Sequence, residues 1–424
     1  MKPEKLIFLV LDGVADSITQ HEPTALEAAE KPALDSLAKH AVYGLVYPVA
    51  PGVAPESDVA VLSLLGYEPE KYYTGRGPLE ALGAGLEIKE GYEVAFRGNF
   101  ATIDESTLKI IDRRVGRSLT SEEARKLAES LDGMELSGGG YARVRATVGH
   151  RVVVIIGSKV NRLSDQVENI DPAYVRKGLV SVAVPNPDMR LRKCKPLVDA
   201  PEARETCRLV DEFVARAIEV LSKHPINVER ERKGLLKANA VILRDAGGRL
   251  PRMPKLQDIY GRKFAAVVEM PVERGIAKAA GMKIVEVNPP SGDLRRDLPE
   301  RLDATLRGLE EADVVYVHLK GPDEPGHDGD FERKKKAVEL IDELFVAPLL
   351  EKVDLERVAI LVTADHATPW PLKSHSGDPV PFILSWKGFS GGPGVFNERA
   401  CKNGIKLEHG WQLLPFTVEK LGWK

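Results

Sequence analysis

The chain has 424 residues, 43% of them hydrophobic, which is enough for two or three domains and at least one large core. Its 60 basic and 63 acidic residues give a net charge of -3, which argues against nucleic acid or a membrane surface as a partner and favours a small molecule. No stretch approaches the roughly 20 apolar residues of a membrane span, and the run Leu6–Leu11 is too short for a signal peptide. We therefore expect a cytoplasmic protein, and we predict no oligomeric state.

The first and last parts of the chain alternate between strand-like and helix-like segments. Continuous aliphatic runs predict buried parallel strands, and an apolar stripe predicts a helix over Glu332–Leu349. The expected strands are Lys5–Leu11, Ala265–Val268, Val314–Leu319 and Val358–Thr363. This alternation predicts an α/β fold with a mainly parallel sheet and helices on both of its faces.

The middle of the chain has a different pattern, in which strand-like stretches surround helical segments. One helix is well marked by apolar residues at helical spacing after Pro201. The strand-like stretches are Tyr92–Ile103, Tyr141–Ile156 and Ala238–Leu243. We expect an inserted α+β cap domain at residues 91–262, and a catalytic domain formed by residues 1–90 and 263–424.

The chain has three cysteines, Cys194, Cys207 and Cys401. They are scattered and odd in number, a pattern that fits neither a disulfide framework nor a zinc site. We expect all three to be ordinary thiols.

Acidic residues follow three of the expected strands. Asp12 ends the first strand, Asp323 comes shortly after Leu319, and Asp365 comes shortly after Thr363. Because ligands bind outside the carboxyl ends of parallel strands, distant parts of the chain can supply one site there. We expect these three carboxylates in one site. His318 lies within a strand pattern, and we assign it to the core.

Histidines accompany two of these acids. His327 comes four residues after Asp323, a spacing that lets both side chains reach one ion, and His366 follows Asp365 directly. His375 comes nine residues after His366. Imidazole and carboxylate ligands suit manganese, zinc or magnesium, and no thiolate is close enough in the sequence to favour a structural zinc site. The pattern therefore predicts a catalytic metal site.

Ser57 begins a predicted helix after a loop that contains proline. A serine in this place is more often a helix N-cap than a nucleophile. A helix N-terminus also favours a phosphate through its backbone N–H groups and dipole, and a hydroxyl there can act as a nucleophile. The residues alone leave both roles open.

Taken in chain order, these motifs resemble the metal-site signature of the alkaline phosphatase superfamily. Within that superfamily the chain resembles the cofactor-independent phosphoglycerate mutases, in particular their archaeal branch, over essentially its whole length. The resemblance rests on Asp12-Gly13, Ser57-Asp58, Thr74–Leu79, Leu163–Asp165, His318–Gly321, Asp323–His327, Thr363–His366 and His375.

The resemblance implies that the protein interconverts 3-phosphoglycerate and 2-phosphoglycerate through a phosphoserine at Ser57. It also implies two divalent metal ions and no bisphosphoglycerate cofactor. Manganese is the expected ion, with magnesium, cobalt and zinc as alternatives. One ion would be bound by Asp323, His327 and His375, and the other by Asp12, Ser57, Asp365 and His366.

In the inserted segment the resemblance is looser. Ile111–Arg117 is similar to the family's arginine-containing substrate segment, and guanidinium groups match phosphate and carboxylate geometry. The expected substrate contacts are Arg113, Arg117, His150, Arg151 and Arg244. The cap is expected to exclude water from the phosphoserine.

The chain departs from the bacterial pattern at two points. Ala367-Thr368 follows His366, where bacterial members have Gly-Asn, and the lysine that bacterial enzymes use near the phosphate has no clear counterpart. We leave Lys320 unassigned.

Two other functions remain open. The first is a metal-dependent phosphomonoesterase or a mutase of another phosphorylated metabolite, because the core motifs specify phosphoryl transfer better than the substrate. The second is a non-catalytic regulator that binds metal and phosphate. The presence of Ser57 together with the full ligand set argues against a regulator.

Overall fold

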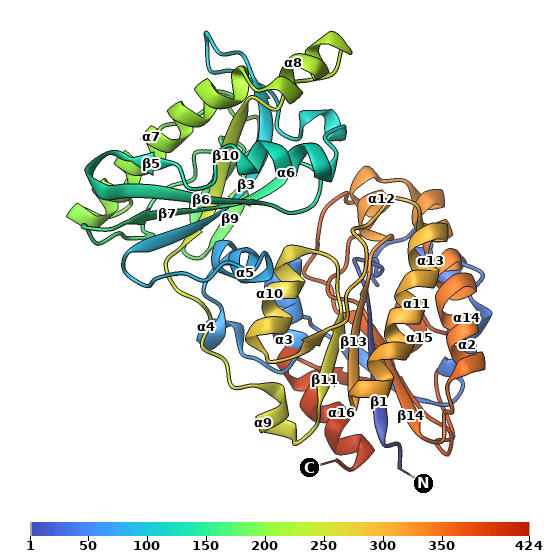
Figure 1. Cartoon of the computed structure of the whole chain (residues 1–424). Coiled ribbons are helices and arrows are strands. Elements are labelled where there is room, and N and C mark those ends of the chain that lie inside the picture. The colour runs from blue at the N-terminus through green and yellow to red at the C-terminus, as the bar shows by residue number, and fades with distance from the viewer. Residues whose placement is uncertain (1, 424) are drawn as a thin grey trace. The chain divides into compact units, whose positions relative to one another are not determined.

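The structure is a computed structural model that describes residues 2–423, which form two compact units (Figure 1). Unit 1 contains the described residues up to Tyr73, Met253–Glu269 and the described residues from Ile276 onward. Unit 2 contains Thr74–Arg252 and Met270–Gly275. The main segment of unit 2 begins at Thr74 and ends at Arg252. The cap expected at residues 91–262 therefore begins and ends later in the chain than this segment.

Unit 1 is built on an eight-stranded sheet with the order β12-β11-β13-β1-β14-β15-β2-β16. All neighbouring strands are parallel except that β15 runs antiparallel to both β14 and β2. The strands are β1 (Lys5–Leu11), β2 (Ala41–Val46), β11 (Phe264–Val267), β12 (Lys283–Ile284), β13 (Val314–Leu319), β14 (Val358–Thr363), β15 (Val380–Ser385) and β16 (Ile405–Leu407). The predicted mainly parallel sheet is confirmed.

Helices cover both faces of this sheet, with α11 and α13 on one face and α3 and α16 on the other (Figure 1). The helix expected over Glu332–Leu349 is present as α13, a π-helical segment at Asp342–Val346 and α14. The helices of unit 1 are α1 (Ala25–Ala28), α2 (Pro32–Ala38), α3 (Ser57–Leu64), α4 (Pro69–Tyr72), α9 (Leu256–Tyr260), α11 (Leu294–Glu311), α12 (Asp323–Asp328), α13 (Phe331–Ile341), α14 (Ala347–Lys352), α15 (Glu398–Cys401), η4 (Gly410–Gln412) and α16 (Leu413–Leu421).

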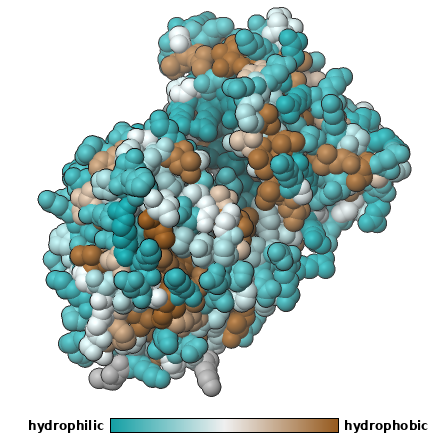
Figure 2. Space-filling model, turned by 180° about the vertical axis from the view of Figure 1, so that it is seen from behind, coloured by the Kyte–Doolittle hydropathy of each residue, from teal (hydrophilic) through white to brown (hydrophobic). Residues whose placement is uncertain are grey.

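The middle of the sheet is the core of unit 1. Every residue of β13 and β14 is buried, as is β1 from Leu6 to Leu11. Such unbroken apolar runs are typical of parallel strands with helices on both faces. Hydrophilic residues cover most of the molecular face in Figure 2, where the hydrophobic residues lie in separate groups.

Unit 2 has an antiparallel sheet with the order β10-β3-β7-β6-β5; β4 pairs with β3, and β8 and β9 form a separate hairpin. The stretch Tyr141–Ile156, expected as strand, contains two antiparallel strands, β6 and β7. The strands of unit 2 are β3 (Glu93–Ile103), β4 (Ile110–Asp112), β5 (Glu135–Leu136), β6 (Gly140–Ala146), β7 (Arg151–Ser158), β8 (Tyr174–Lys177), β9 (Val180–Ala183) and β10 (Ala240–Gly247). The predicted α+β insertion is confirmed.

The two faces of the unit 2 sheet belong to different cores. On β7, Val152, Val154 and Ile156 join the core with α6 and α7, whereas Val153 and Ile155 join the core with α5. This alternation follows from the two-residue period of a strand. The helices are α5 (Arg76–Gly83), η1 (Val115–Arg117), α6 (Ser121–Glu129), η2 (Ser137–Gly139), α7 (Pro201–Ser222) and α8 (Pro225–Arg232); α10 (Pro271–Ala279) is divided between the units.

The cysteine prediction was wrong for two of the three residues. Cys194 and Cys207 form a disulfide in unit 2, while Cys401 is a buried free thiol. Cys207 lies on α7, and the loop before this helix brings Cys194 to it. The fold creates this pairing, which the sequence spacing of 13 residues does not indicate. Among the described helices, none has the length and hydrophobicity that a membrane crossing requires.

Candidate active site

The loops after β13, β1 and β14 lie next to one another because these strands are neighbours in the parallel sheet. Asp12 follows β1 directly, and Asp365 and His366 follow β14 after one residue. Asp323 begins α12, the short helix after β13. The strand order therefore brings together side chains that are more than 300 residues apart in sequence.

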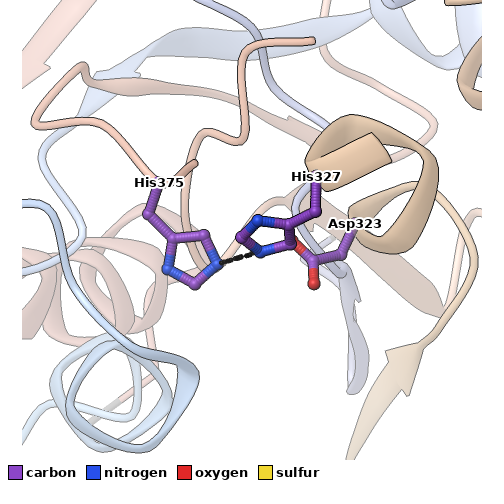
Figure 3. Close-up of side chains that lie close together, drawn as sticks. All are labelled: Asp323, His327 and His375. Atoms are coloured by element: carbon purple, nitrogen blue, oxygen red, sulfur yellow. Dashed lines mark hydrogen bonds and ion pairs between the residues drawn. The ribbon is translucent and has the colours of Figure 1, made fainter. Parts of the chain in front are cut away.

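Asp323, His327 and His375 form a group that we call cluster one (Figure 3). The Nε2 atoms of His327 and His375 are 3.1 Å apart, and each lies 3.5 Å from Oδ1 of Asp323. Asp323 and His327 stand one helical turn apart on α12, so both side chains reach the same point. Three potential ligand atoms converge there.

Asp12, Asp365 and His366 form a second group, cluster two, whose side chains are almost entirely buried. Nε2 of His366 lies 3.4 Å from Oδ1 of Asp12 and 3.3 Å from Oδ2 of Asp365. The hydroxyl oxygen of Ser57 lies 3.2 Å from the same nitrogen. The serine is therefore adjacent to cluster two.

Both clusters fit divalent metal ions. Ligand bonds of about 2.0–2.2 Å in tetrahedral or octahedral geometry place neighbouring ligand atoms roughly 3.0–3.5 Å apart, close to the spacing seen in both clusters. Oδ1 of Asp12 and Oδ2 of Asp365 are buried and accept no hydrogen bond in the described structure. Buried carboxylate oxygens without partners are costly, and a bound cation would satisfy them. The clustered oxygen and nitrogen donors suit manganese, magnesium or zinc.

The three imidazoles of the clusters are oriented alike. Nδ1 of His375 lies 2.7 Å from the carbonyl oxygen of Pro55, and Nδ1 of His327 lies 3.3 Å from that of Lys373. Nδ1 of His366 lies 3.0 Å from the hydroxyl oxygen of Thr368. A proton on each Nδ1 would leave Nε2 with a lone pair that faces its cluster, which is the usual arrangement of histidine ligands.

The charges of the clusters shift the pKa values of three of their members. Burial raises the pKa values of Asp323 and Asp365, but the nearby histidines outweigh it, so both pKa values lie well below the ordinary range. Burial lowers the pKa of His366, but the negative charges of Asp365, Asp323 and Asp12 raise it to about 9. The carboxylates of Asp323 and Asp365 are thus ionised and strongly attract positive charge.

Ser57 occupies the first turn of α3, and the N-cap is Glu56. The N-cap role considered for Ser57 is therefore wrong. The helix starts here because Glu56 is extended at φ -82° and ψ 157°, after the Pro55 loop. The Ser57 hydroxyl points to His366 across 3.2 Å.

Three further residues of this region were not predicted to belong to the site. Buried His318 lies in β13 as expected, but its Nε2 atom is also 3.4 Å from Oδ2 of Asp365. Nζ of Lys320 lies 3.0 Å from Oδ2 of Asp12, and Thr368 contacts both clusters. In the sequence, His318 and Lys320 are polar residues at the carboxyl end of an apolar strand. This position could have indicated that they belong to the site.

The five expected substrate contacts all lie in unit 2, which has a concentration of positive charge. The guanidinium groups of Arg244 and Arg113 lie 3.9 Å and 5.0 Å from the centre of the Tyr174 ring. Arg113 also forms an ion pair with Asp171. These contacts fix the direction of both arginines.

His150 lies close to several other arginines of the same unit. Burial and then the charges of neighbouring arginines lower the pKa of His150 to about 3, so its imidazole is neutral at pH 7. The arginines responsible are Arg151, Arg114, Arg97 and Arg117. Arg97 and Arg114 were not among the expected substrate contacts. In a chain with 60 basic residues, a single arginine gives little indication of a binding role.

Comparisons with known proteins agree with one another. The family model described as 2,3-bisphosphoglycerate-independent phosphoglycerate mutase matches residues 38–227. A protein of that name from Aeropyrum pernix is 50% identical, covering 98% of this chain and 99% of the relative. A 2,3-bisphosphoglycerate-independent phosphoglycerate mutase 1 from Archaeoglobus fulgidus is 39% identical over 89% of this chain and 88% of the relative.

Two solved structures are similar over nearly the whole chain. A protein from Pyrococcus horikoshii has a TM-score of 0.77 and 27% identity, covering 100% of this chain and 98% of the other. A cofactor-independent phosphoglycerate mutase from Thermoplasma acidophilum has a TM-score of 0.59 and 28% identity, covering 98% of this chain and 99% of the other.

Proposed function

The chain belongs to the family of 2,3-bisphosphoglycerate-independent phosphoglycerate mutases and interconverts 3-phosphoglycerate and 2-phosphoglycerate, and we propose that it does so through a phosphoserine at Ser57. The observation that supports the nucleophile is the position of its hydroxyl, 3.2 Å from Nε2 of His366 and adjacent to cluster two. The phosphoryl group would remain on Ser57 between its removal from one oxygen of the substrate and its transfer to the other. No phosphorylated cofactor is then needed.

In the proposed forward reaction, the Ser57 oxygen attacks the phosphorus of 3-phosphoglycerate. The bond from phosphorus to the 3-oxygen breaks, and this oxygen takes up the proton that the serine loses. The 2-hydroxyl oxygen then attacks the phosphorus of the phosphoserine, the bond from phosphorus to the Ser57 oxygen breaks, and this oxygen takes up the proton of the 2-hydroxyl. The atoms and charges balance without an external donor.

We propose that cluster one and cluster two each hold a divalent ion, with manganese as the expected metal. Asp323, His327 and His375 would hold one ion, and Ser57 would join Asp12, Asp365 and His366 at the other. When bound, the two ions would withdraw charge from the phosphoryl oxygens and favour the alkoxide form of Ser57. The ionised carboxylates and the direction of the imidazole Nε2 atoms support this assignment.

We propose that unit 2 is the substrate-binding cap and that Arg113, Arg117, His150, Arg151 and Arg244 bind the anionic groups of the substrate. The positive charge around His150 and the fixed guanidinium groups beside Tyr174 support this role. The cap would also exclude water, since hydrolysis of the phosphoserine would turn the mutase into a phosphatase. We propose that the enzyme acts in glycolysis and gluconeogenesis in the cytoplasm.

The test is an assay of the purified protein with manganese and 3-phosphoglycerate, without bisphosphoglycerate, that follows both 2-phosphoglycerate and free phosphate. The mutase forms 2-phosphoglycerate with little phosphate, whereas release of phosphate alone would indicate a phosphomonoesterase. In an acid-quenched sample, mass spectrometry should find the phosphoryl group on the peptide with Ser57. Ser57→Ala should abolish turnover while manganese still binds, and Ser63→Ala, later in α3, serves as the control.

A further inference from the structure

We propose that Thr368 is a positioning residue that links cluster one to cluster two, so that its hydroxyl determines the metal affinity of both. This inference rests on the proposed function, because it presumes that each cluster binds an ion. Thr368 is one of the two residues at which the chain departs from the bacterial pattern after His366.

The hydroxyl of Thr368 is completely buried between the clusters. Its oxygen lies 2.8 Å from Oδ1 of Asp323, in cluster one, and 3.0 Å from Nδ1 of His366, in cluster two. An ionised carboxylate only accepts hydrogen bonds, so the hydroxyl donates its proton to Asp323. It therefore accepts the bond from the N–H group of His366.

This direction has a consequence at each cluster. In cluster two it keeps Nδ1 of His366 protonated, so that Nε2, which faces Asp12 and Asp365, is the nitrogen left to bind an ion. In cluster one it holds the Asp323 oxygen that lies 3.5 Å from both His327 and His375. One hydroxyl thus orients a ligand of each proposed ion.

The other two cluster histidines lack such a link. The nitrogen Nδ1 of His375 faces the carbonyl oxygen of Pro55, and that of His327 faces the carbonyl oxygen of Lys373. A carbonyl group only accepts, so the hydrogen-bond chain ends there. A hydroxyl both accepts and donates, and the chain from His366 continues through Thr368 to Asp323.

The backbone of Thr368 is held in place on both sides. Its N–H group donates to the carbonyl oxygen of Ala15 at 2.9 Å, and its carbonyl oxygen accepts a bond from Nζ of Lys334 at 2.8 Å. A Cβ atom on Gly326 would lie 2.7 Å from this carbonyl oxygen, so the helix with cluster one packs closely against it. The position of the hydroxyl is therefore set by the fold.

The test compares Thr368→Val, which removes the hydroxyl and keeps the shape, with Thr368→Ser, which keeps the hydroxyl. Each change is made in two backgrounds. His327→Ala disables cluster one and leaves cluster two, whereas Asp12→Asn disables cluster two and leaves cluster one. Manganese is titrated into each metal-free protein, and free manganese is followed by electron paramagnetic resonance. Circular dichroism checks the fold, and Thr368→Ala replaces the valine variant if that variant does not fold.

We expect Thr368→Val to weaken manganese binding about 10- to 100-fold in both backgrounds, the usual effect of losing a partner of a metal ligand. Thr368→Ser should restore the affinity of both clusters to within about threefold, because the hydroxyl remains. Unchanged affinity, or a loss at cluster two alone, would overturn the link. If the unmodified chain failed to bind two manganese ions, the proposed metal sites themselves would be rejected instead.

Discussion

Lys334 and Asp16 form an ion pair in which both side chains are completely buried, with 2.7 Å between Nζ and Oδ1. The ammonium group also donates to the carbonyl oxygens of Ala15 and Thr368. The carboxylate accepts bonds from the N–H groups of Ala25 and Trp370. These bonds offset the desolvation of the two charges and join the loops after β1 and β14.

Lys334→Met should lower the free energy of unfolding by about 3–5 kcal/mol, because it leaves the charge of Asp16 buried without its partner. Urea denaturation of the metal-free protein measures this change. Lys335→Met is the matched control, since its ion pair with Glu339 is more exposed and should contribute less than about 1 kcal/mol. Equal losses in the two variants would contradict the importance of the buried pair.

Gly13→Ala should disrupt cluster one. Gly13 has φ +58°, and a Cβ atom there would lie 2.6 Å from Oδ1 of Asp323 and 2.7 Å from the hydroxyl oxygen of Thr368. We expect loss of turnover and of at least one bound manganese ion, measured by titration. Gly52→Ala also places alanine at a positive φ, of +75°, but has no atom within 4 Å of the new Cβ, so it should retain both ions. Full metal binding by the Gly13 variant would show that the loop can move aside.

Glu398→Gln should change how stability depends on pH. Burial, followed by the charge of Asp16, raises the pKa of Glu398 to about 7 in the folded state. The folded chain therefore holds a proton that the unfolded chain loses near pH 4.5. The stabilisation is complete below this pH, is lost as pH rises towards 7, and amounts to roughly 3 kcal/mol.

Urea denaturation of the metal-free protein between pH 4.5 and 8 measures this effect as the difference between the two proteins. Over this range the unmodified chain should lose stability relative to Glu398→Gln, with most of the change complete near pH 7. Glu408→Gln, at an exposed position, should give a profile parallel to that of the unmodified chain. A parallel profile for Glu398→Gln would mean that Glu398 is already ionised in the folded protein at pH 5.

Arg244→Lys should raise the KM for 3-phosphoglycerate about 10- to 100-fold, which corresponds to a loss of about 1.5–3 kcal/mol, the contribution expected of a hydrogen bond to a charged group. Lysine keeps the charge but has no planar fork to stack on Tyr174. Steady-state assays should show a smaller effect on kcat. Arg252→Lys, an exposed residue of the same unit, is the control. Equal KM values for both variants would remove Arg244 from the substrate contacts.

Much of the fold could be predicted from the sequence because its strongest signals are local. Strands β1, β13 and β14 are mainly apolar runs, and an acidic residue comes at or shortly after the end of each. The rule that such acids gather at one edge of a parallel sheet placed Asp12, Asp365 and Asp323 together. The metal-binding role of these residues remains a prediction.

Contacts between distant segments could not be predicted in this way. Lys334 stands in a run of three lysines that is typical of a solvated surface, yet only Lys334 shares the buried face of α13 with Ala337 and Ile341. Thr368 looks like an ordinary loop residue until the fold places it beside Asp323. The pairing of Cys194 with Cys207 likewise depends on the path of the loop before α7.

The position of β1 between β13 and β14 also affects how the protein is made. Leu6 pairs with Val314, so this strand leaves the ribosome about 300 residues before its partners. At typical rates of about 5–20 residues per second, it waits roughly 15–60 s for them. Unit 2 has its own core and is synthesised almost entirely in that interval. We therefore expect unit 2 to fold on the nascent chain first, while the apolar β1 segment depends on the ribosome surface or on chaperones for protection.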